Sequence, residues 1–121
     1  MNKRAIIIDD ERLARAELRK LLTDFPEIEV LDEAANVEEA LEKIDLLQPD
    51  IIFLDINMPG KSGLDLLEKV KSEFKNPPPI MMMITAYGDD LNFQKAKQLG
   101  ADDFFTKPVD FLKLKERINN F

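Results

Sequence analysis

A run of four apolar residues at positions 51–54 leads directly into a single carboxylate, Asp55. The run has no polar alternation, so it predicts a strand buried on both faces, as in a parallel sheet packed between helices. Pro59 and Gly60 then predict a turn that leads the chain away. Asp55 is therefore expected at the carboxyl end of a central strand, which is the edge of an open α/β sheet where ligands bind.

Four further segments have the character of strands. Unbroken apolar runs at residues 5–8 and 80–84 predict two more central strands. In residues 28–31, apolar residues alternate with acids, which predicts an edge strand. Residues 103–106 predict a short fifth strand. The chain is therefore expected to contain a five-stranded sheet.

Helical segments are expected between these strands. Apolar residues at helical spacing form stripes within residues 14–25, 37–47, 64–74, 91–99 and 111–121. Asn36 and Ser62 are expected to cap the second and third helices, and Gly100 to end the fourth. The fourth helix has few apolar residues, which predicts weak anchoring. With right-handed connections, this order of elements predicts a doubly wound α/β sheet with helices on both faces.

Composition excludes several classes of protein. With 121 residues, the chain is expected to form a single domain that buries roughly two-thirds of its unfolded surface. It contains no cysteine, so neither a disulfide framework nor a thiolate metal site is expected. Its apolar segments are too short for a signal peptide or a membrane span, which predicts a cytoplasmic protein without membrane contact.

Charge and histidine content narrow the function further. The net charge of -7 argues against a broad basic face for nucleic acid. The sequence contains no histidine, which excludes a histidine phosphodonor, a histidine-based catalytic triad and a histidine metal site within this chain. A metal bound here would have to be held by oxygen ligands.

Five polar residues lie where predicted strands end: Asp9, Asp10, Asp55, Thr85 and Lys107. Because the carboxyl ends of parallel strands meet at one edge of a sheet, these side chains are expected on one rim although they lie far apart in the sequence. Taken singly, each is more often a helix cap, a solvated charge or an ordinary strand-end residue. Their joint occurrence at strand ends favours a functional site.

The residue types on this rim indicate a particular chemistry. Three carboxylates close together repel one another, and a hard divalent cation would neutralise them. Oxygen ligands with room for water suit Mg²⁺ better than zinc. One carboxylate can then act as a nucleophile toward phosphorus, with the ion and Lys107 balancing phosphoryl charge and the hydroxyl of Thr85 donating a hydrogen bond.

The motifs at the strand ends resemble, in order and spacing, the receiver domain of two-component response regulators. The resemblance covers the whole chain, residues 1–121, and implies a single receiver domain. It also implies a CheY-like, flavodoxin-like fold, with a five-stranded parallel sheet in the order 2-1-3-4-5. Each motif is weak alone, but together they are specific.

The resemblance assigns roles to individual residues. Asp9 and Asp10, after the first apolar run, match the acidic pair that holds Mg²⁺, and Asp55 in FLDINMPG matches the phosphoacceptor. The backbone carbonyl of Asn57 would be a further metal ligand. The remaining matches are Thr85 in ITAYG as the switch hydroxyl, Lys107 in FFTKP as the phosphate-contacting lysine, and Lys107-Pro108 as a cis peptide.

The resemblance also implies a function. Asp55 would accept a phosphoryl group from a sensor histidine kinase or a histidine phosphotransfer protein and later lose it to water, with no other enzymatic activity. Thr85 and the aromatic residue Phe104 would switch position and alter the face made by the fourth helix, fifth strand and fifth helix. That face would bind an output partner or effector domain, and it also allows a homodimer. Core packing is the alternative role for Phe104.

Three other functions fit parts of the pattern. A haloacid dehalogenase type phosphatase also uses an aspartate nucleophile with Mg²⁺, but it carries a second acid where this chain has Asn57. A flavodoxin-like cofactor protein is disfavoured because the acidic loop after the first strand would repel a nucleotide phosphate. A degenerate receiver that serves only as a binding module is disfavoured by the complete set of acids. Direct binding of nucleic acid by this domain is not expected, because it has no basic recognition helix.

Overall fold

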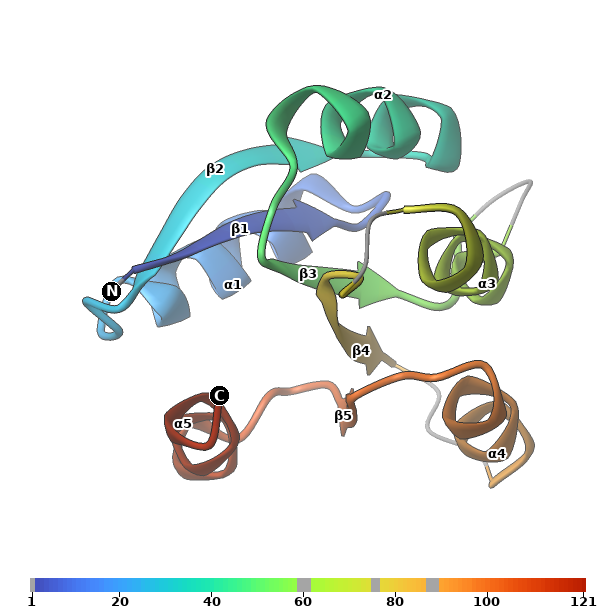
Figure 1. The fold of residues 1–121 in the computed structure, drawn as a ribbon. Coiled ribbons are helices and arrows are strands. Elements are labelled where there is room, and N and C mark those ends of the chain that lie inside the picture. The colour runs from blue at the N-terminus through green and yellow to red at the C-terminus, as the bar shows by residue number, and fades with distance from the viewer. Residues whose placement is uncertain (1, 59–61, 75–76, 87–89) are drawn as a thin grey trace.

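The structure is a computed structural model that describes residues 2–58, 62–74, 77–86 and 90–121. The turn predicted at Pro59 and Gly60 therefore lies outside the described residues. Strands and helices alternate along the chain (Figure 1). The strands are β1 (Lys3–Ile8), β2 (Ile28–Ala34), β3 (Ile51–Asp55), β4 (Ile80–Thr85) and β5 (Asp103–Thr106). The helices are α1 (Arg12–Leu22), α2 (Val37–Leu47), α3 (Gly63–Glu73), α4 (Asp90–Gln98) and α5 (Phe111–Asn119).

All strand pairs are parallel, and the strand order is β2-β1-β3-β4-β5. This confirms the predicted doubly wound sheet and its order. Strand β2 lies at one edge, as its alternation with acids predicted, and β3 lies at the centre. All five residues of β3 are buried, as expected for a strand covered on both faces.

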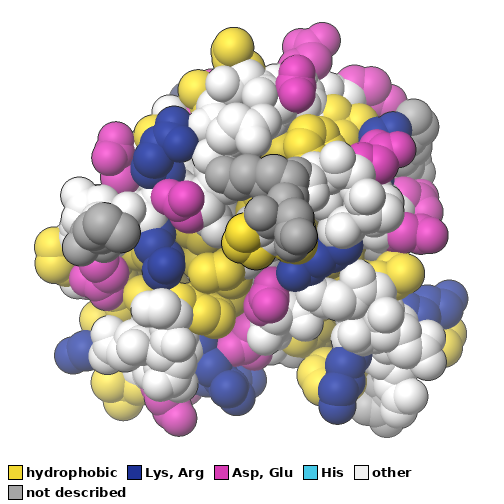
Figure 2. Space-filling model, in the orientation of Figure 1, with side chains coloured by type: hydrophobic (Ala, Val, Ile, Leu, Met, Phe, Trp, Pro, Cys, Tyr) yellow, Lys and Arg dark blue, Asp and Glu magenta, His cyan; other side chains and the backbone are white. Residues whose placement is uncertain are grey.

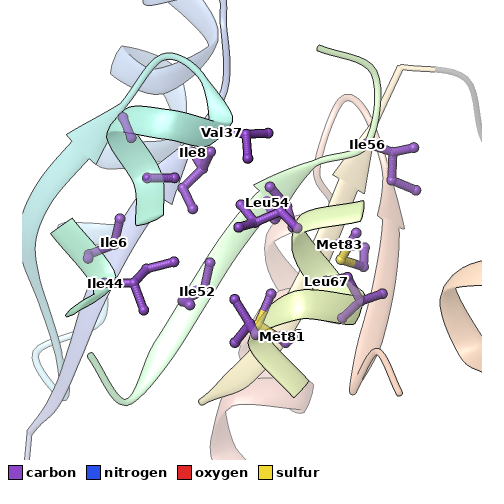
Figure 3. Packing of buried hydrophobic residues seen from close by; sticks show 14 of the residues in the cluster. Ile6, Ile8, Val37, Ile44, Ile52, Leu54, Ile56, Leu67, Met81 and Met83 are labelled. Carbon is purple, nitrogen blue, oxygen red and sulfur yellow. The ribbon is translucent and has the colours of Figure 1, made fainter. Parts of the chain in front are cut away.

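The sheet separates two apolar cores, because successive side chains of a strand point to opposite faces. One core joins alternate residues of β1, β3 and β4 to α2, α3 and Ala96 of α4. Figure 3 shows this side, where labelled isoleucine, leucine and methionine side chains of the strands meet Val37 and Ile44 of α2 and Leu67 of α3. The other core joins the intervening strand residues to Leu22 of α1 and to Leu114 and Ile118 of α5.

Local signals at the helix ends act as predicted. The side chain of Asn36 accepts a hydrogen bond from the backbone N–H of Glu39 at 2.8 Å. Ser62 and Asp65 form a reciprocal capping box at the start of α3. Gly100 follows α4 with a φ of +97°, in the left-handed region that glycine adopts without strain.

Several element boundaries differ from the sequence-based expectation. Strand β2 runs on to Ala34, because its later residues pair with β1 as far as Ile8. Helix α1 ends at Leu22, where the N–H groups of the next three residues bond to carbonyls three residues back in tighter turns, yet Phe25 is only 3% exposed and still belongs to the core. Helix α5 ends at Asn119, and Phe121 is exposed.

Helix α4 is weakly anchored, as predicted. Ala96 is its buried residue among those described, while Leu91 and Phe93 are exposed by 63% and 46%. Across the described ranges, the helices are too short or too polar to cross a membrane.

Candidate functional site at the carboxyl edge of the sheet

Parallel pairing brings the predicted site residues to one edge of the sheet. Ile8 pairs with Leu54, so Asp9 follows β1 beside the position where Asp55 ends β3. Asp55 pairs with Ile84, and Thr85 pairs with Thr106, the residue before Lys107. The strand register therefore explains why residues distant in sequence meet on this rim.

Three carboxylates form a compact cluster on the rim. Oxygen atoms of Asp9, Asp10 and Asp55 all lie within 4.8 Å of one another. The side chains of Asp9 and Asp55 are buried, and Asp10 is half-buried. An all-oxygen donor set of concentrated negative charge fits a hard divalent cation such as Mg²⁺.

Asp9 is held from several directions. Its Oδ2 accepts a 2.8 Å hydrogen bond from Lys107 Nζ, and its Oδ1 accepts one from the backbone N–H of Glu11 at 2.9 Å. Its own N–H donates to the carbonyl of Ala34 at 3.0 Å, and its carbonyl accepts from Arg15 Nη1 at 2.7 Å. Contacts from α1, β2 and the residue after β5 thus fix the first acid of the pair.

Asp55 lies in surroundings that disfavour its ionised form. Its Oδ1 accepts a hydrogen bond from the N–H of Asn57 at 3.2 Å, and its Oδ2 is 3.8 Å from Lys107 Nζ. Burial, reinforced by the charge of Asp9, raises the pKa of Asp55 to about 6, although Lys107 and the Asn57 N–H act in the opposite direction. The carboxylate would be better stabilised by a further cation.

Lys107 is the positive group at the centre of this cluster. Burial disfavours its charge, but the hydrogen bond to Asp9 and the charges of Asp55 and Asp9 outweigh that effect and raise the pKa of Lys107. The ammonium group therefore remains charged next to the carboxylates. The peptide bond from Lys107 to Pro108 is cis.

Thr85 is fully buried at the end of β4. Its hydroxyl oxygen accepts a 2.6 Å hydrogen bond from Nδ2 of Asn57, and its carbonyl accepts from the N–H of Lys107 at 2.8 Å. Sequence reasoning did not anticipate this contact between the side chains of Asn57 and Thr85. It connects the segment after β3 to the end of β4.

Gly63 is a second residue that sequence reasoning missed. A Cβ atom at this position would lie 2.3 Å from the carbonyl oxygen of Asp55 and 2.8 Å from Cα of Ile56. The N–H of Gly63 also donates to the carbonyl of Ile56 at 2.9 Å. Helix α3 thus begins in direct contact with the backbone of Asp55, and a glycine in the first helical position was the available sequence signal.

Phe104 lies apart from the charged cluster, at the edge of the core beneath α4. Its ring meets that of Phe93 edge-on, with centroids 5.3 Å apart and an interplanar angle of 75°. It is half-buried and packs against the core cluster that contains Ala96. Phe104 therefore links β5 to the weakly anchored helix α4.

A cavity of about 430 Å³ borders the rim on the side of α1. Asp9, Asp55 and Lys107 contribute to its lining, together with apolar residues of α1 and Val109. The two carboxylates therefore border open space even though they are largely buried.

Comparison with known proteins identifies the family. Residues 5–119 match the model of the response regulator receiver domain. The chain belongs to this family. Membership of this family agrees with the five-stranded parallel sheet and its strand order.

The receiver is similar in sequence to parts of several larger proteins. It is 41% identical over 116 residues to the sensory transduction protein LytR of Staphylococcus haemolyticus, covering 96% of this chain and 44% of that protein. It is 37% identical over 120 residues to a protein-glutamate methylesterase/protein-glutamine glutaminase of Bacillus subtilis, covering 95% of this chain and 33% of that protein. The chain thus spans less than half the length of these curated relatives.

Solved structures share the whole fold of the receiver. The signal receiver domain of a DNA binding response regulator from Colwellia psychrerythraea has a TM-score of 0.89 at 27% identity, covering 98% of this chain and 97% of that one. The CheX-CheY-BeF3-Mg+2 complex from Borrelia burgdorferi contains a chain with a TM-score of 0.85 at 29% identity, covering 98% of this chain and 87% of that one.

Proposed function

We propose that this receiver accepts a phosphoryl group on Asp55 and changes conformation in response, with residues 1–121 acting as one receiver domain. The observation that carries the proposal is the position of Asp55: it is buried at the end of the central strand, within 4.8 Å of two other acids at the oxygen atoms, and 3.8 Å from Lys107 Nζ. Such a carboxylate is a nucleophile whose surroundings are ready to balance added negative charge.

Mg²⁺ is the cofactor that the donor set fits. Asp9, Asp10 and Asp55 would supply carboxylate oxygens, and Asn57 would supply its backbone carbonyl. When bound, the ion would offset the charge of the carboxylates and of the phosphoryl oxygens. The Borrelia burgdorferi complex, which holds Mg²⁺ and beryllium fluoride, supports the assignment by similarity.

The chemical step is a displacement at phosphorus. A carboxylate oxygen of Asp55 forms a bond to the phosphorus of a phosphohistidine as the phosphorus–nitrogen bond breaks, and the imidazole nitrogen keeps the electron pair. Lys107 balances charge on the phosphoryl oxygens. Attack by water later releases phosphate and restores the carboxylate, so the chain catalyses only its own phosphorylation and dephosphorylation.

The conformational response would begin at Thr85. In the present structure its hydroxyl oxygen accepts a hydrogen bond from Nδ2 of Asn57, and the hydroxyl hydrogen would be donated to a phosphoryl oxygen after phosphorylation. Phe104 would then leave its contact with Phe93 and turn inward. Because Ala96 is the buried anchor of α4 among the described residues, this helix can move at low energetic cost.

The partners follow from this scheme. The phosphoryl donor would be a sensor histidine kinase or a histidine phosphotransfer protein, and the face of α4, β5 and α5 would bind an output partner, an effector domain or a second copy. On the face seen in Figure 2, basic side chains are interspersed with acidic ones and form no broad patch, which supports the absence of direct nucleic acid binding there. We place these events in the cytoplasm.

The decisive experiment is the intact mass after incubation with Mg²⁺ and acetyl phosphate. The expected result is one added phosphoryl group on the wild type and none with a chelator or in Asp55→Asn. Addition of the group to Asp55→Asn at the wild-type level would overturn the assignment of the acceptor. Absence of the group from the wild type, together with failure to bind beryllium fluoride, would leave a receiver that serves only as a binding module.

A further inference from the structure

Arg15 contacts the backbone between the two acids that follow β1. Its Nη1 donates a 2.7 Å hydrogen bond to the carbonyl oxygen of Asp9, and its side chain is only 17% exposed. This carbonyl belongs to the peptide unit that joins Asp9 to Asp10. Since a peptide unit is planar, a donor that fixes its carbonyl also fixes the direction in which the chain enters Asp10.

Glu33 of β2 holds Arg15 in this orientation. Arg15 Nε is 3.0 Å from Oε1 of Glu33, and the other carboxylate oxygen, Oε2, accepts from Arg19 Nε at 2.6 Å. The backbone carbonyl of Glu33 accepts a hydrogen bond from Lys43 Nζ. The planar guanidinium of Arg15 therefore spans from β2 to the acidic loop, which a single point charge could not do.

Simple electrostatics does not explain a guanidinium at this place. A positive group so close to a cluster of carboxylates competes with a bound cation and should lower its affinity. The hydrogen bond of Arg15, however, goes to the backbone carbonyl of Asp9. The oxygen atoms of the three carboxylates lie within 4.8 Å of one another. Orientation of the peptide by Arg15 should therefore raise the affinity for the cation, whereas the charge of Arg15 should lower it. An experiment can separate the two effects because they have opposite signs.

We propose that Arg15, held by Glu33, is a positioning residue of the metal site. It orients the peptide between Asp9 and Asp10 so that both carboxylates point toward Asp55. The inference rests on the proposed function, because it requires that the three acids bind Mg²⁺. Partners outside the direct ligands typically contribute 10- to 100-fold to metal affinity, and a loss of roughly 10-fold is expected when Arg15 is replaced.

The test is calorimetric titration of chelator-treated protein with Mg²⁺ alone. Arg15→Gln and Arg15→Lys are both expected to bind roughly 10-fold more weakly than the wild type, because lysine keeps the charge but lacks the planar fork. Arg19→Gln is the matched control: it removes a neighbouring positive charge that contacts Glu33, while the contact of Arg15 with Asp9 stays in place. Its affinity is expected to stay close to that of the wild type.

Two further measurements separate positioning from misfolding. Thermal unfolding verifies that each variant is folded, and the amide resonances of Asp10 and Glu11 are expected to move in Arg15→Gln before any metal is added. If Arg15→Gln does not fold, Glu33→Gln gives the second route, since it releases the guanidinium and is expected to weaken Mg²⁺ binding by a smaller factor.

The outcomes are distinct. Unchanged or tighter binding of Mg²⁺ by Arg15→Gln, or wild-type affinity in Arg15→Lys, would overturn the positioning role while leaving the proposed function intact. Equal binding by Glu33→Gln and the wild type would remove Glu33 from the scheme. A wild type that does not bind Mg²⁺ at all would refute the metal site itself and the positioning role with it.

Discussion

The side-chain amide of Asn57 donates a 2.6 Å hydrogen bond to the hydroxyl oxygen of Thr85, which is fully buried. Asn57 lies two residues beyond the proposed phosphoacceptor, and Thr85 ends the neighbouring strand β4. The contact therefore stabilises the position that Thr85 occupies in this structure. Loss of the contact should favour any state in which the hydroxyl turns elsewhere.

Asn57→Ala is expected to shift the unphosphorylated receiver toward its phosphorylated conformation. A hydrogen bond of this kind contributes about 1 kcal/mol, which corresponds to roughly a fivefold change in the ratio of the two states. The measurement is the set of amide chemical shifts of α4 in the unphosphorylated variant, compared with those of the wild type with and without beryllium fluoride.

The control for this prediction is the same change in a Thr85→Ala background. Without the hydroxyl, Asn57→Ala should no longer move the α4 resonances. An equal displacement in both backgrounds would show that Asn57 acts on α4 by a route that does not include Thr85.

Gly63→Ala is expected to disrupt the site, because the added Cβ would meet the carbonyl oxygen of Asp55 at 2.3 Å. The overlap is with backbone, so α3 or the segment after β3 must shift, at a cost of about 1–3 kcal/mol in the free energy of unfolding. Denaturant unfolding measures this cost, and intact mass with acetyl phosphate measures the expected loss of phosphorylation.

Gly100→Ala is the matched control for Gly63. Its added Cβ has space, with the nearest atoms on the Lys71 side chain at 3.5 Å, but the φ of +97° makes the backbone unfavourable by about 1–2 kcal/mol. It should destabilise the fold by a similar amount and leave phosphorylation in place. Equal loss of phosphorylation in both variants would attribute the effect of Gly63→Ala to general destabilisation.

Lys107→Gln is expected to make stability depend more strongly on Mg²⁺. Lys107 Nζ lies 2.8 Å from Asp9 and 3.8 Å from Asp55, so its removal leaves two buried carboxylates without this positive charge. The metal-free variant should lose on the order of 2 kcal/mol, and saturating Mg²⁺ should restore part of the loss. Thermal unfolding with Mg²⁺ or with chelator measures both.

Lys71→Gln provides the comparison for Lys107. Lys71 pairs with Asp102 at 2.9 Å, and neither residue belongs to the acidic cluster. Its loss of stability should be the same with and without Mg²⁺. Equal recovery of both variants on adding Mg²⁺ would refute the idea that Lys107 and the ion offset the same charge.

Asp55→Asn is expected to stabilise the metal-free receiver at pH 7. The pKa of Asp55 is raised from 3.8 in the unfolded chain to about 6 in the folded one, so the folded state favours the protonated carboxyl. The contribution of Asp55 to the free energy of unfolding is therefore fully present below about pH 3.8 and is lost as the pH rises through about 6. Asparagine avoids that loss, which is on the order of 1–2 kcal/mol after solvent screening.

The difference in the free energy of unfolding between Asp55→Asn and the wild type should shrink as the pH is lowered from 7 to 5. Chemical denaturation in the presence of chelator measures this difference. Asp45→Asn, which removes a carboxylate at an exposed position on α2 away from the rim, is the control for the loss of one negative charge. An Asp55→Asn advantage that is constant across this range would contradict the raised pKa.

Much of the fold was predictable, because each strand and helix has its own local pattern. The run at 51–54 has no polar alternation, and β3 is buried throughout. The alternation of β2 with acids correctly indicated an edge strand. Asn36 and Ser62 cap the helices for which they were expected, since a cap needs only a short side chain and the backbone that follows it.

The candidate site was predictable only in part. The sequence predicted which residues gather on the rim, because Asp9, Asp55, Thr85 and Lys107 stand at strand ends. The hydrogen bond of Asn57 to Thr85 could not be predicted, because it depends on side-chain rotamers across two strands. Likewise, the contact of Gly63 with the backbone of Asp55 depends on how closely α3 approaches β3.

The sequence by itself determined the order of strands and helices, the edge at which the acids collect and the kind of cation that they suit, because these depend on residue type and local periodicity. Tertiary structure alone decided which groups touch: Arg15 on the carbonyl of Asp9, Lys107 between Asp9 and Asp55, and Asn57 on Thr85. The physical reason is distance. A hydrogen bond or an ion pair depends on tenths of an ångström between elements that pack side by side, and periodicity along the chain carries no information about that spacing.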